Sequence, residues 1–133
     1  KAILFNLYKS AEGKIIFHDF WFLRCSPCMD ELPHYNNLIE KAGNEIEFIF
    51  YGVYMDEKKW KDAVKNYQLK GKYHLLTKNQ IAFFERYFNL KGFPHHQLIN
   101  KKGLIINENL PRVSPDNYEW ILGIFEKIRE NND

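Results

Sequence analysis

The chain has 133 residues, of which 45% are hydrophobic and 17% aromatic, enough for the core of one domain. Its 19 basic and 17 acidic residues nearly balance. No basic cluster is interleaved with aromatic residues, so we expect no nucleic-acid partner. No apolar run approaches the roughly 20 residues that cross a bilayer. Two cysteines are too few for a disulfide-rich secreted scaffold.

The first third of the chain predicts two strands and a helix. Residues 5–8 and 15–23 are rich in Ile and Phe and are separated by a turn over residues 10–13. The second run is nearly continuous in apolar residues, as expected of a strand buried on both faces. Pro27 precedes a helix that Gly43 ends. The apolar positions of this helix lie on one face: Met29, Leu32, Tyr35, Leu38 and Ile39.

The middle of the chain predicts a second buried strand over residues 46–53, followed by a helix over 57–67 that Asp56 caps. Three side chains of this helix are expected to point inward: Trp60, Val64 and Tyr67. Residues 69–77 form a basic, irregular connection in which a short strand is expected over 73–76.

The last third predicts a short aromatic helix over residues 80–88, a loop over 89–94, and two strands over 96–100 and 104–107. Gly103 suits the positive-φ position of the tight hairpin between these strands. After a turn-rich link, Asp116 opens an amphipathic helix. Its expected inward side chains are Trp120, Ile121, Ile124, Phe125 and Ile128.

This order of elements predicts an α/β fold with a mixed sheet and helices on both faces. In open α/β sheets the reactive site lies at the carboxyl ends of the strands. Cys25 comes just after such an end.

Both cysteines stand in one motif, Cys25-Ser26-Pro27-Cys28, at the junction between a strand and a helix. This spacing is typical of a redox site. A helix N-terminus favours a thiolate because its free N–H groups and positive dipole end stabilise an anion. Arg24 adds a positive charge. We therefore assign Cys25 as the nucleophile and Cys28, one turn inward, as the resolving thiol.

A structural disulfide or half of a zinc site is the alternative for this motif. Zinc in proteins needs four ligands, and a Cys pair is usually completed by a second pair or by two histidines. None of the histidines follows Cys28 in a zinc-finger spacing: His18, His34, His74, His95 and His96. This favours redox chemistry.

Residues 16–33, IFHDFWFLRCSPCMDELP, resemble the active-site segment of thioredoxin-fold proteins, most closely the TlpA/ResA-like thiol-disulfide oxidoreductases. Gly92-Phe93-Pro94 resembles the Gly-x-Pro loop of that family, and residues 98–103 resemble its Leu-Ile-Asp-x-x-Gly hairpin. The resemblance implies a single thioredoxin-like domain over residues 1–133, with an extra N-terminal strand and an inserted helix. Since Lys1 is not Met, we expect this domain to be the C-terminal part of a longer precursor.

The resemblance also assigns roles to two carboxylates. Asp19 matches the buried carboxylate that thioredoxins use to manage the proton of the resolving cysteine, and Glu31 matches a family glutamate that tunes the thiols. The alternatives are a solvated carboxylate at a strand end for Asp19 and an ordinary acid near a helix start for Glu31.

Substrate binding is expected around the second matched loop. Pro94 is expected to be cis, which leaves the backbone of Phe93 free to pair with an extended partner segment. Trp21 and Phe93 are candidates for a hydrophobic collar that docks partners, with core packing as the alternative. His95 and His96 could bind copper with the cysteines, although we favour one as a strand residue and the other as exposed.

The resemblance implies an extracytoplasmic protein, expected in the periplasm, that is either tethered to the membrane or fused to a further part through the missing N-terminal region. It would act as a monomeric reductant of partner proteins, supplied by an upstream electron donor, with no organic cofactor or metal. Arg24 and His95 depart from the family pattern. They keep open a rival function, a redox-inactive module that binds a partner peptide, copper or zinc.

Overall fold

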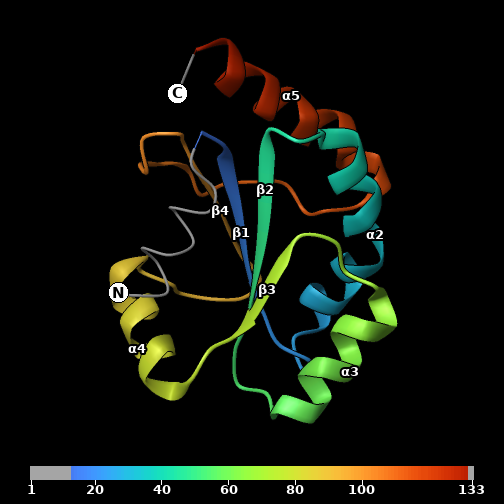
Figure 1. Cartoon of the computed structure of the whole chain (residues 1–133), viewed down its shortest axis with the longest axis vertical. Coiled ribbons are helices and arrows are strands. Elements are labelled where there is room, and N and C mark those ends of the chain that lie inside the picture. Colours follow the sequence, from blue (N-terminus) through green and yellow to red (C-terminus); the bar gives the residue numbers. More distant parts are fainter. Residues whose placement is uncertain (1–12, 132–133) are drawn as a thin grey trace.

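The computed structural model describes residues 13–131, so the strand expected over residues 5–8 and most of the turn after it lie outside the described residues. Within that range one mixed sheet has the order β3-β2-β1-β4-β5. Its strands are β1 (Ile15–Trp21), β2 (Ile46–Gly52), β3 (Lys72–Leu75), β4 (His95–Ile99) and β5 (Ile105–Asn107). This confirms the predicted mixed α/β sheet, with β1 at its centre (Figure 1).

The direction of each strand follows from its connection. β1, β2 and β3 run parallel because helices cross over between them. β4 runs antiparallel to β1, and the hairpin after it makes β5 antiparallel to β4. In that hairpin the Gly103 N–H donates to Asn100 O at 2.9 Å, with φ of +85° at Gly103, as predicted.

The helices are α2 (Ser26–Ala42), α3 (Glu57–Tyr67), α4 (Lys78–Tyr87), the 3₁₀ turn η1 (Pro115–Asn117) and α5 (Tyr118–Glu130). Helices α2, α3 and α5 cover one face of the sheet, and α4 covers the other (Figure 1). The sheet therefore divides the core into two clusters. None of the helices in the described range combines the length and the apolarity needed to span a membrane.

Pleating of β1 sends alternate side chains to these two faces. Phe17 and Trp21 belong to the cluster beneath α2, whereas Ile16 and Phe20 belong to the cluster beneath α4. Asp19 lies two residues after Phe17, so its side chain points to the same face of the sheet, toward α2. On β4, the antiparallel register places His96 opposite Asp19.

Two helix starts differ from the prediction. Helix α4 begins two residues early because Thr77 and Gln80 form a capping box: Gln80 N–H donates to Thr77 Oγ1, and Thr77 N–H donates to Gln80 Oε1. At the C-terminal end, η1 precedes α5, so the helix proper starts at Tyr118 rather than at Asp116.

The prediction that Trp120 points inward is wrong, since its side chain is 63% exposed. The buried face of α5 starts from Tyr118 and continues through Ile121, Phe125 and Ile128. Trp120 lies between Tyr118 and Ile121 in the sequence, but on the side of the helix turned to solvent. Ile124 is half-buried beside it.

Candidate active site

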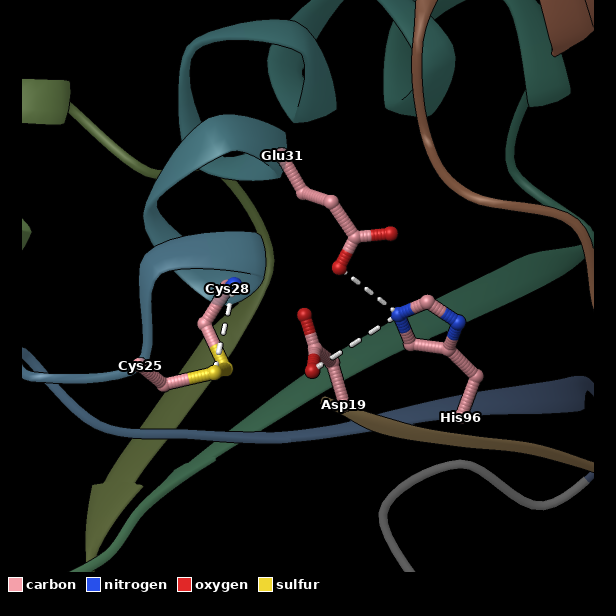
Figure 2. The surroundings of a disulfide bond; sticks show 5 residues. All are labelled: Asp19, Cys25, Cys28, Glu31 and His96. Atoms are coloured by element: carbon pink, nitrogen blue, oxygen red, sulfur yellow. Dashed lines mark hydrogen bonds and ion pairs between the residues drawn. A yellow bond between two sulfur atoms is a disulfide. The ribbon is translucent and has the colours of Figure 1, made fainter. Parts of the chain in front are cut away.

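Cys25 and Cys28 are joined as a disulfide at the start of α2, with their Cα atoms 5.2 Å apart. Cys25 is the N-cap, and its Sγ accepts the Cys28 N–H at 3.2 Å (Figure 2). Cys25 is 6% exposed and Cys28 1%. The pair therefore has an outer sulfur that a partner can approach more easily and an inner one enclosed by the core.

The start of α2 favours a negative charge on the outer sulfur. Its first turn contains no acidic residue, so the free N–H groups of that turn are not already neutralised. Pro27 lies within the first turn, where its missing N–H costs no helical hydrogen bond. Arg24 is exposed directly before the N-cap. These features lower the cost of a thiolate at Cys25.

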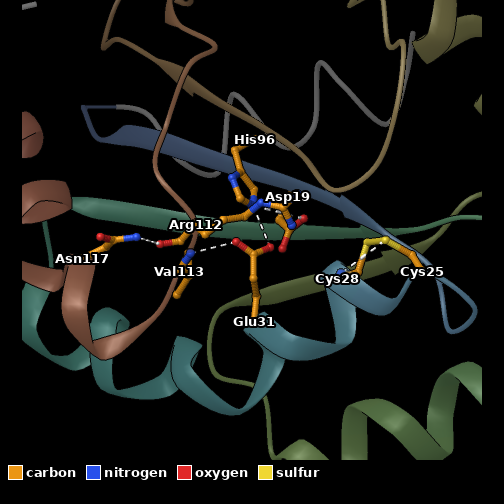
Figure 3. A network of polar contacts seen from close by, with 8 residues as sticks. All are labelled: Asp19, Cys25, Cys28, Glu31, His96, Arg112, Val113 and Asn117. Carbon is orange, nitrogen blue, oxygen red and sulfur yellow. Dashed lines mark hydrogen bonds and ion pairs between the residues drawn. A yellow bond between two sulfur atoms is a disulfide. The ribbon is translucent and has the colours of Figure 1, made fainter.

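A buried cluster of Asp19, Glu31 and His96 lies on the inner side of the disulfide (Figures 2 and 3). His96 Nε2 is 2.9 Å from Glu31 Oε1 and 3.9 Å from Asp19 Oδ1. A carboxylate can only accept, so the shorter contact requires a proton on His96 Nε2. Three elements, β1, α2 and β4, thus bring these groups together.

The other oxygen of Glu31 is also occupied. Glu31 Oε2 accepts the backbone N–H of Val113 at 2.8 Å (Figure 3). The loop that carries Val113 is held in turn by Asn117, whose Nδ2 donates to Arg112 O at 2.9 Å. Glu31 is therefore anchored at both oxygens, from β4 and from the loop before η1.

Burial changes the proton affinity of this cluster. Desolvation raises the pKa of Asp19 to about 7, opposed by the charge of His96 and reinforced by that of Glu31. Desolvation acts against the charged form of His96. The hydrogen bond to Glu31 and the charges of the two carboxylates outweigh it, so the pKa of His96 is raised. Asp19 can therefore exchange a proton near neutral pH, and its carboxylate and that of Glu31 favour the charged form of His96.

A second polar network lies on the opposite face of the sheet. His18 Nδ1 is 3.0 Å from Gln97 Nε2, and Gln97 Oε1 is 3.1 Å from His95 Nε2. Desolvation, reinforced by His95, lowers the pKa of His18 to about 3, so His18 is neutral. This network lies on the face of the sheet that α4 covers. Neither of these two hydrogen bonds involves a cysteine.

The loop before β4 has the expected cis bond between Phe93 and Pro94. Phe93 is half-buried, and its ring packs edge-on against Phe22 at 5.4 Å and Tyr54 at 6.2 Å between centroids. Tyr54 is exposed beside it. An aromatic rim of Phe22, Tyr54 and Phe93 thus lies near the cysteine motif, and the role of Phe93 and Pro94 in substrate binding stays a prediction.

Trp21 does not belong to this rim. Its side chain is 0% exposed and packs in the cluster beneath α2. The expectation that Trp21 contacts partners is therefore corrected: its position in β1 points the indole into the core, and the aromatic surface comes from Phe22 and Tyr54 instead.

The structure also separates the two adjacent histidines. His95 is half-buried on the α4 face, and His96 is buried on the α2 face, so neither is the exposed residue that we favoured. The two side chains cannot both join the cysteines around one copper ion. The ligand atoms of Asp19, Glu31 and His96 do lie within 4.8 Å of one another, as a metal site would require. However, both Glu31 oxygens already accept hydrogen bonds.

The predicted site residues Cys25, Cys28, Asp19 and Glu31 come together in the structure. His96 is the member whose contact with Glu31 sequence reasoning missed. Their 65-residue separation hides the contact. The only available signal was the pairing of β1 with β4, which places His96 opposite Asp19 once the register is known.

Comparison with known proteins agrees with this geometry. A family model described as thioredoxin-like matches residues 13–105. The chain is 30% identical over 101 residues to the thiol-disulfide oxidoreductase ResA of Bacillus thuringiensis subsp. konkukian, covering 75% of this chain and 57% of that protein. A Bacillus cereus ResA is 27% identical over 121 residues, or 90% of this chain and 66% of that one. The chain thus spans less than two thirds of these relatives.

Solved structures show the same fold. The thioredoxin domain of a thiol-disulfide oxidoreductase from Bacteroides vulgatus superimposes with a TM-score of 0.76 at 23% identity, covering 90% of this chain and 83% of that one. StoA from Bacillus subtilis gives a TM-score of 0.67 at 19% identity, covering 82% and 83% respectively.

Proposed function

The chain belongs to the thioredoxin-like family, and from this premise we propose that it exchanges disulfides with partner proteins through Cys25 and Cys28. The observation that carries the proposal is the position of the pair, with Cys25 capping α2 and Cys28 buried one turn inward. This arrangement provides one attacking thiol and one resolving thiol. The similarity to ResA supports the same chemistry.

Reduction of a partner then proceeds in two exchanges. The Cys25 thiolate attacks a disulfide of the partner, forms a mixed disulfide and releases one partner sulfur as a thiolate. The Cys28 thiol gives its proton to the Asp19 carboxylate, and its thiolate attacks Cys25 Sγ. The bond between Cys25 and the partner breaks, and the second partner sulfur leaves as a thiolate. Cys25 and Cys28 lose two electrons, and the partner gains them.

The two carboxylates have separate tasks in this scheme. Asp19, whose pKa of about 7 lies near neutral pH, accepts the proton of Cys28 and returns it to solvent. Glu31 is held by hydrogen bonds at both oxygens, and it tunes the thiols through its fixed charge rather than by moving. Neither step uses an organic cofactor or a metal.

The partner approaches from the exposed side of the motif, where Arg24, Ser26 and Pro27 are exposed. We propose that an extended segment of the partner pairs with the backbone before Pro94 and contacts Phe93. We further propose that the protein is an extracytoplasmic, monomeric reductant that an upstream dithiol donor restores, as the family resemblance implies. Fractionation and size-exclusion chromatography of the full-length protein test the compartment and the monomer.

Dithiothreitol-coupled reduction of insulin tests the exchange chemistry directly. We expect Cys25→Ser to lower the rate to that of dithiothreitol alone, because the attacking sulfur is gone. Cys28→Ser should stop turnover as well and accumulate a mixed disulfide with insulin, visible on a non-reducing gel, because Cys25 can still attack. Undiminished turnover by Cys25→Ser would contradict the proposal.

The redox-inactive binding module makes different predictions in the same preparation. Its disulfide would have a reduction potential below about −300 mV, the range typical of structural disulfides. It would not reduce insulin in the wild-type form, and a copper- or zinc-binding version would retain the metal stoichiometrically after dialysis. A potential within the range of the thioredoxins and disulfide isomerases, roughly −270 to −180 mV, supports exchange instead.

A further inference from the structure

His96 lies beneath the active-site helix, and the reaction scheme given above assigns it no step. Its ring is buried, packs against Phe17 at 5.6 Å between centroids, and donates to Glu31 Oε1 at 2.9 Å. Asp19 Oδ1, at 3.9 Å from the same Nε2, has no hydrogen-bond partner among the described residues. His96 therefore holds Glu31 by a hydrogen bond and leaves Asp19 Oδ1 able to take a proton.

The charges in this part of the core have to balance. Burying an unpaired carboxylate is unfavourable because the charge loses its hydration, so a buried acid either finds a counter-charge or keeps its proton. The groups that face His96 are Asp19 from β1, Glu31 from α2 and Arg112 from the loop before η1, with His95 adjacent on β4. The Tyr35 hydroxyl of α2 also faces Asp19. Arg112 is exposed, which leaves His96 as the buried cation of the cluster.

We infer that His96 is a positioning residue for the thiol chemistry: it fixes Glu31 beside the cysteines and supplies the positive charge that allows Asp19 to ionise there. This inference rests on the proposed function, because Asp19 is needed as a base only if Cys28 must lose a proton. His96 itself keeps its proton throughout. It contributes a fixed charge and a fixed donor.

The direction of the pKa changes agrees with this role. The pKa of His96 is raised in spite of burial, because the hydrogen bond to Glu31 and the two carboxylate charges favour the imidazolium. The charge of His96 in turn lowers the pKa of Asp19 against the effect of burial. Without His96, Asp19 would remain protonated to higher pH and would accept the Cys28 proton less readily.

The test compares His96→Gln with His95→Gln in the insulin assay from pH 5 to 9. Gln keeps a donor for Glu31 but carries no charge. We expect the midpoint of the rate–pH profile to rise by about one unit in His96→Gln, so that the rate below the midpoint falls about tenfold. His95→Gln is the matched control. It changes the preceding residue of the same strand, whose side chain bonds to Gln97 on the other face of the sheet, and it should keep the wild-type midpoint.

A second background tests whether His96 acts together with Glu31. In Glu31→Gln, His96 loses the anion that keeps it charged. Adding His96→Gln to that variant should therefore change the midpoint much less than it does in the wild type. Equal shifts in both backgrounds, or a wild-type midpoint in His96→Gln, would overturn the inference and leave the proposed exchange through Cys25 intact. The Cys25→Ser assay tests that exchange separately.

An NMR titration of the wild-type protein avoids the risk that His96→Gln does not fold. We expect the imidazole signal of His96 to titrate above pH 6.5, the value of an unperturbed histidine. The same signal should titrate at lower pH in Glu31→Gln. Titration below 6.5 in the wild type would overturn the inference. So would stoichiometric Zn²⁺ uptake that His96→Gln abolishes, because the cluster would then be a metal site.

Discussion

Two buried ionisable residues on β1 are neighbours in the chain and respond to pH in opposite directions. The pKa of His18 falls to about 3, so between that pH and 6.5 the unfolded chain binds a proton that the native protein does not. Stability from this group is lost as pH falls through that window. The pKa of Asp19 rises to about 7 from 3.8, so its effect has the opposite sign: stability is lost as pH rises. In the wild type we expect the two effects to offset each other, because they have opposite signs over overlapping pH ranges.

Asp19→Asn removes the contribution of Asp19 to the pH dependence of stability and leaves that of His18. We expect the variant to gain stability relative to the wild type as pH rises from 4 to 7. The gain should reach on the order of 4 kcal/mol, since about three pKa units separate the two states of Asp19. Urea denaturation at pH 4, 5.5 and 7 measures it. The control Asp62→Asn removes an exposed carboxylate paired with Lys58 and should change stability by less than about 1 kcal/mol at each pH. A constant difference between Asp19→Asn and wild type across this range would contradict the pKa of Asp19.

The residues that the sequence could predict are those that act locally. Cys25 and Cys28 share one motif, and Asp19 and Glu31 lie within six residues of it, so the helix start and the matched family segment located all four. His96 could not be found in this way. Its contact with Glu31 depends on the register of β4 against β1, which long-range packing decides. Trp21 was wrongly placed among the partner-contacting residues because it is close to the motif in sequence. Closeness in sequence does not indicate to which face of the sheet a strand side chain points.

At the scale of elements, the buried strands and long helices were predictable from periodicity, and their ends were less so. β1 and β2 are nearly continuous apolar runs, and α3 starts at the predicted cap, where Asp56 Oδ1 accepts the Lys59 N–H at 3.0 Å. The start of α4 was missed although Thr77 and Gln80 carry the capping-box spacing. The predicted helix start was instead placed at residue 80, because it was judged from the aromatic stripe that follows. The surplus of apolar residues in α5 likewise hid which face is buried.

Thr77→Ala tests the cap that positions α4. The variant loses the side chain that accepts the Gln80 N–H, so we expect a loss of about 1 kcal/mol in the free energy of unfolding. Insulin reduction should be unchanged, because α4 lies on the face of the sheet away from the cysteines. The urea midpoint at constant m-value measures the loss. Ser114→Ala is the matched control: Ser114 is the N-cap of η1 but makes no side-chain capping bond. An equal loss in both variants would show that the capping bond is not the cause.

At the scale of the whole molecule, the sheet separates stability from chemistry. Among the described residues, the aromatic cluster beneath α4 adjoins the network around His18, and the half-buried Phe22 and Phe93 pack against it. The other, beneath α2 and α5, also surrounds the disulfide and the charged cluster. We therefore expect a core change beneath α4 to alter mainly stability, and one beneath α2 and α5 to alter the charged cluster as well.

Phe17→Leu and Phe84→Leu test this division. Both rings are buried and packed against other aromatic rings, so each replacement should cost about 1 to 3 kcal/mol of unfolding free energy. Phe17 also contacts the His96 ring, whereas Phe84 contacts Phe20 and Tyr51 on the other face. Only Phe17→Leu should therefore move the pH midpoint of insulin reduction. Without the Phe17 ring against it, the His96 side chain would hold Glu31 less firmly and would compensate the negative charge of Asp19 less well. Urea denaturation and the rate–pH profile are measured on the same preparations. If Phe84→Leu moved the midpoint as far as Phe17→Leu at equal loss of stability, the shift would reflect a general loosening of the fold, and the two faces would not be independent.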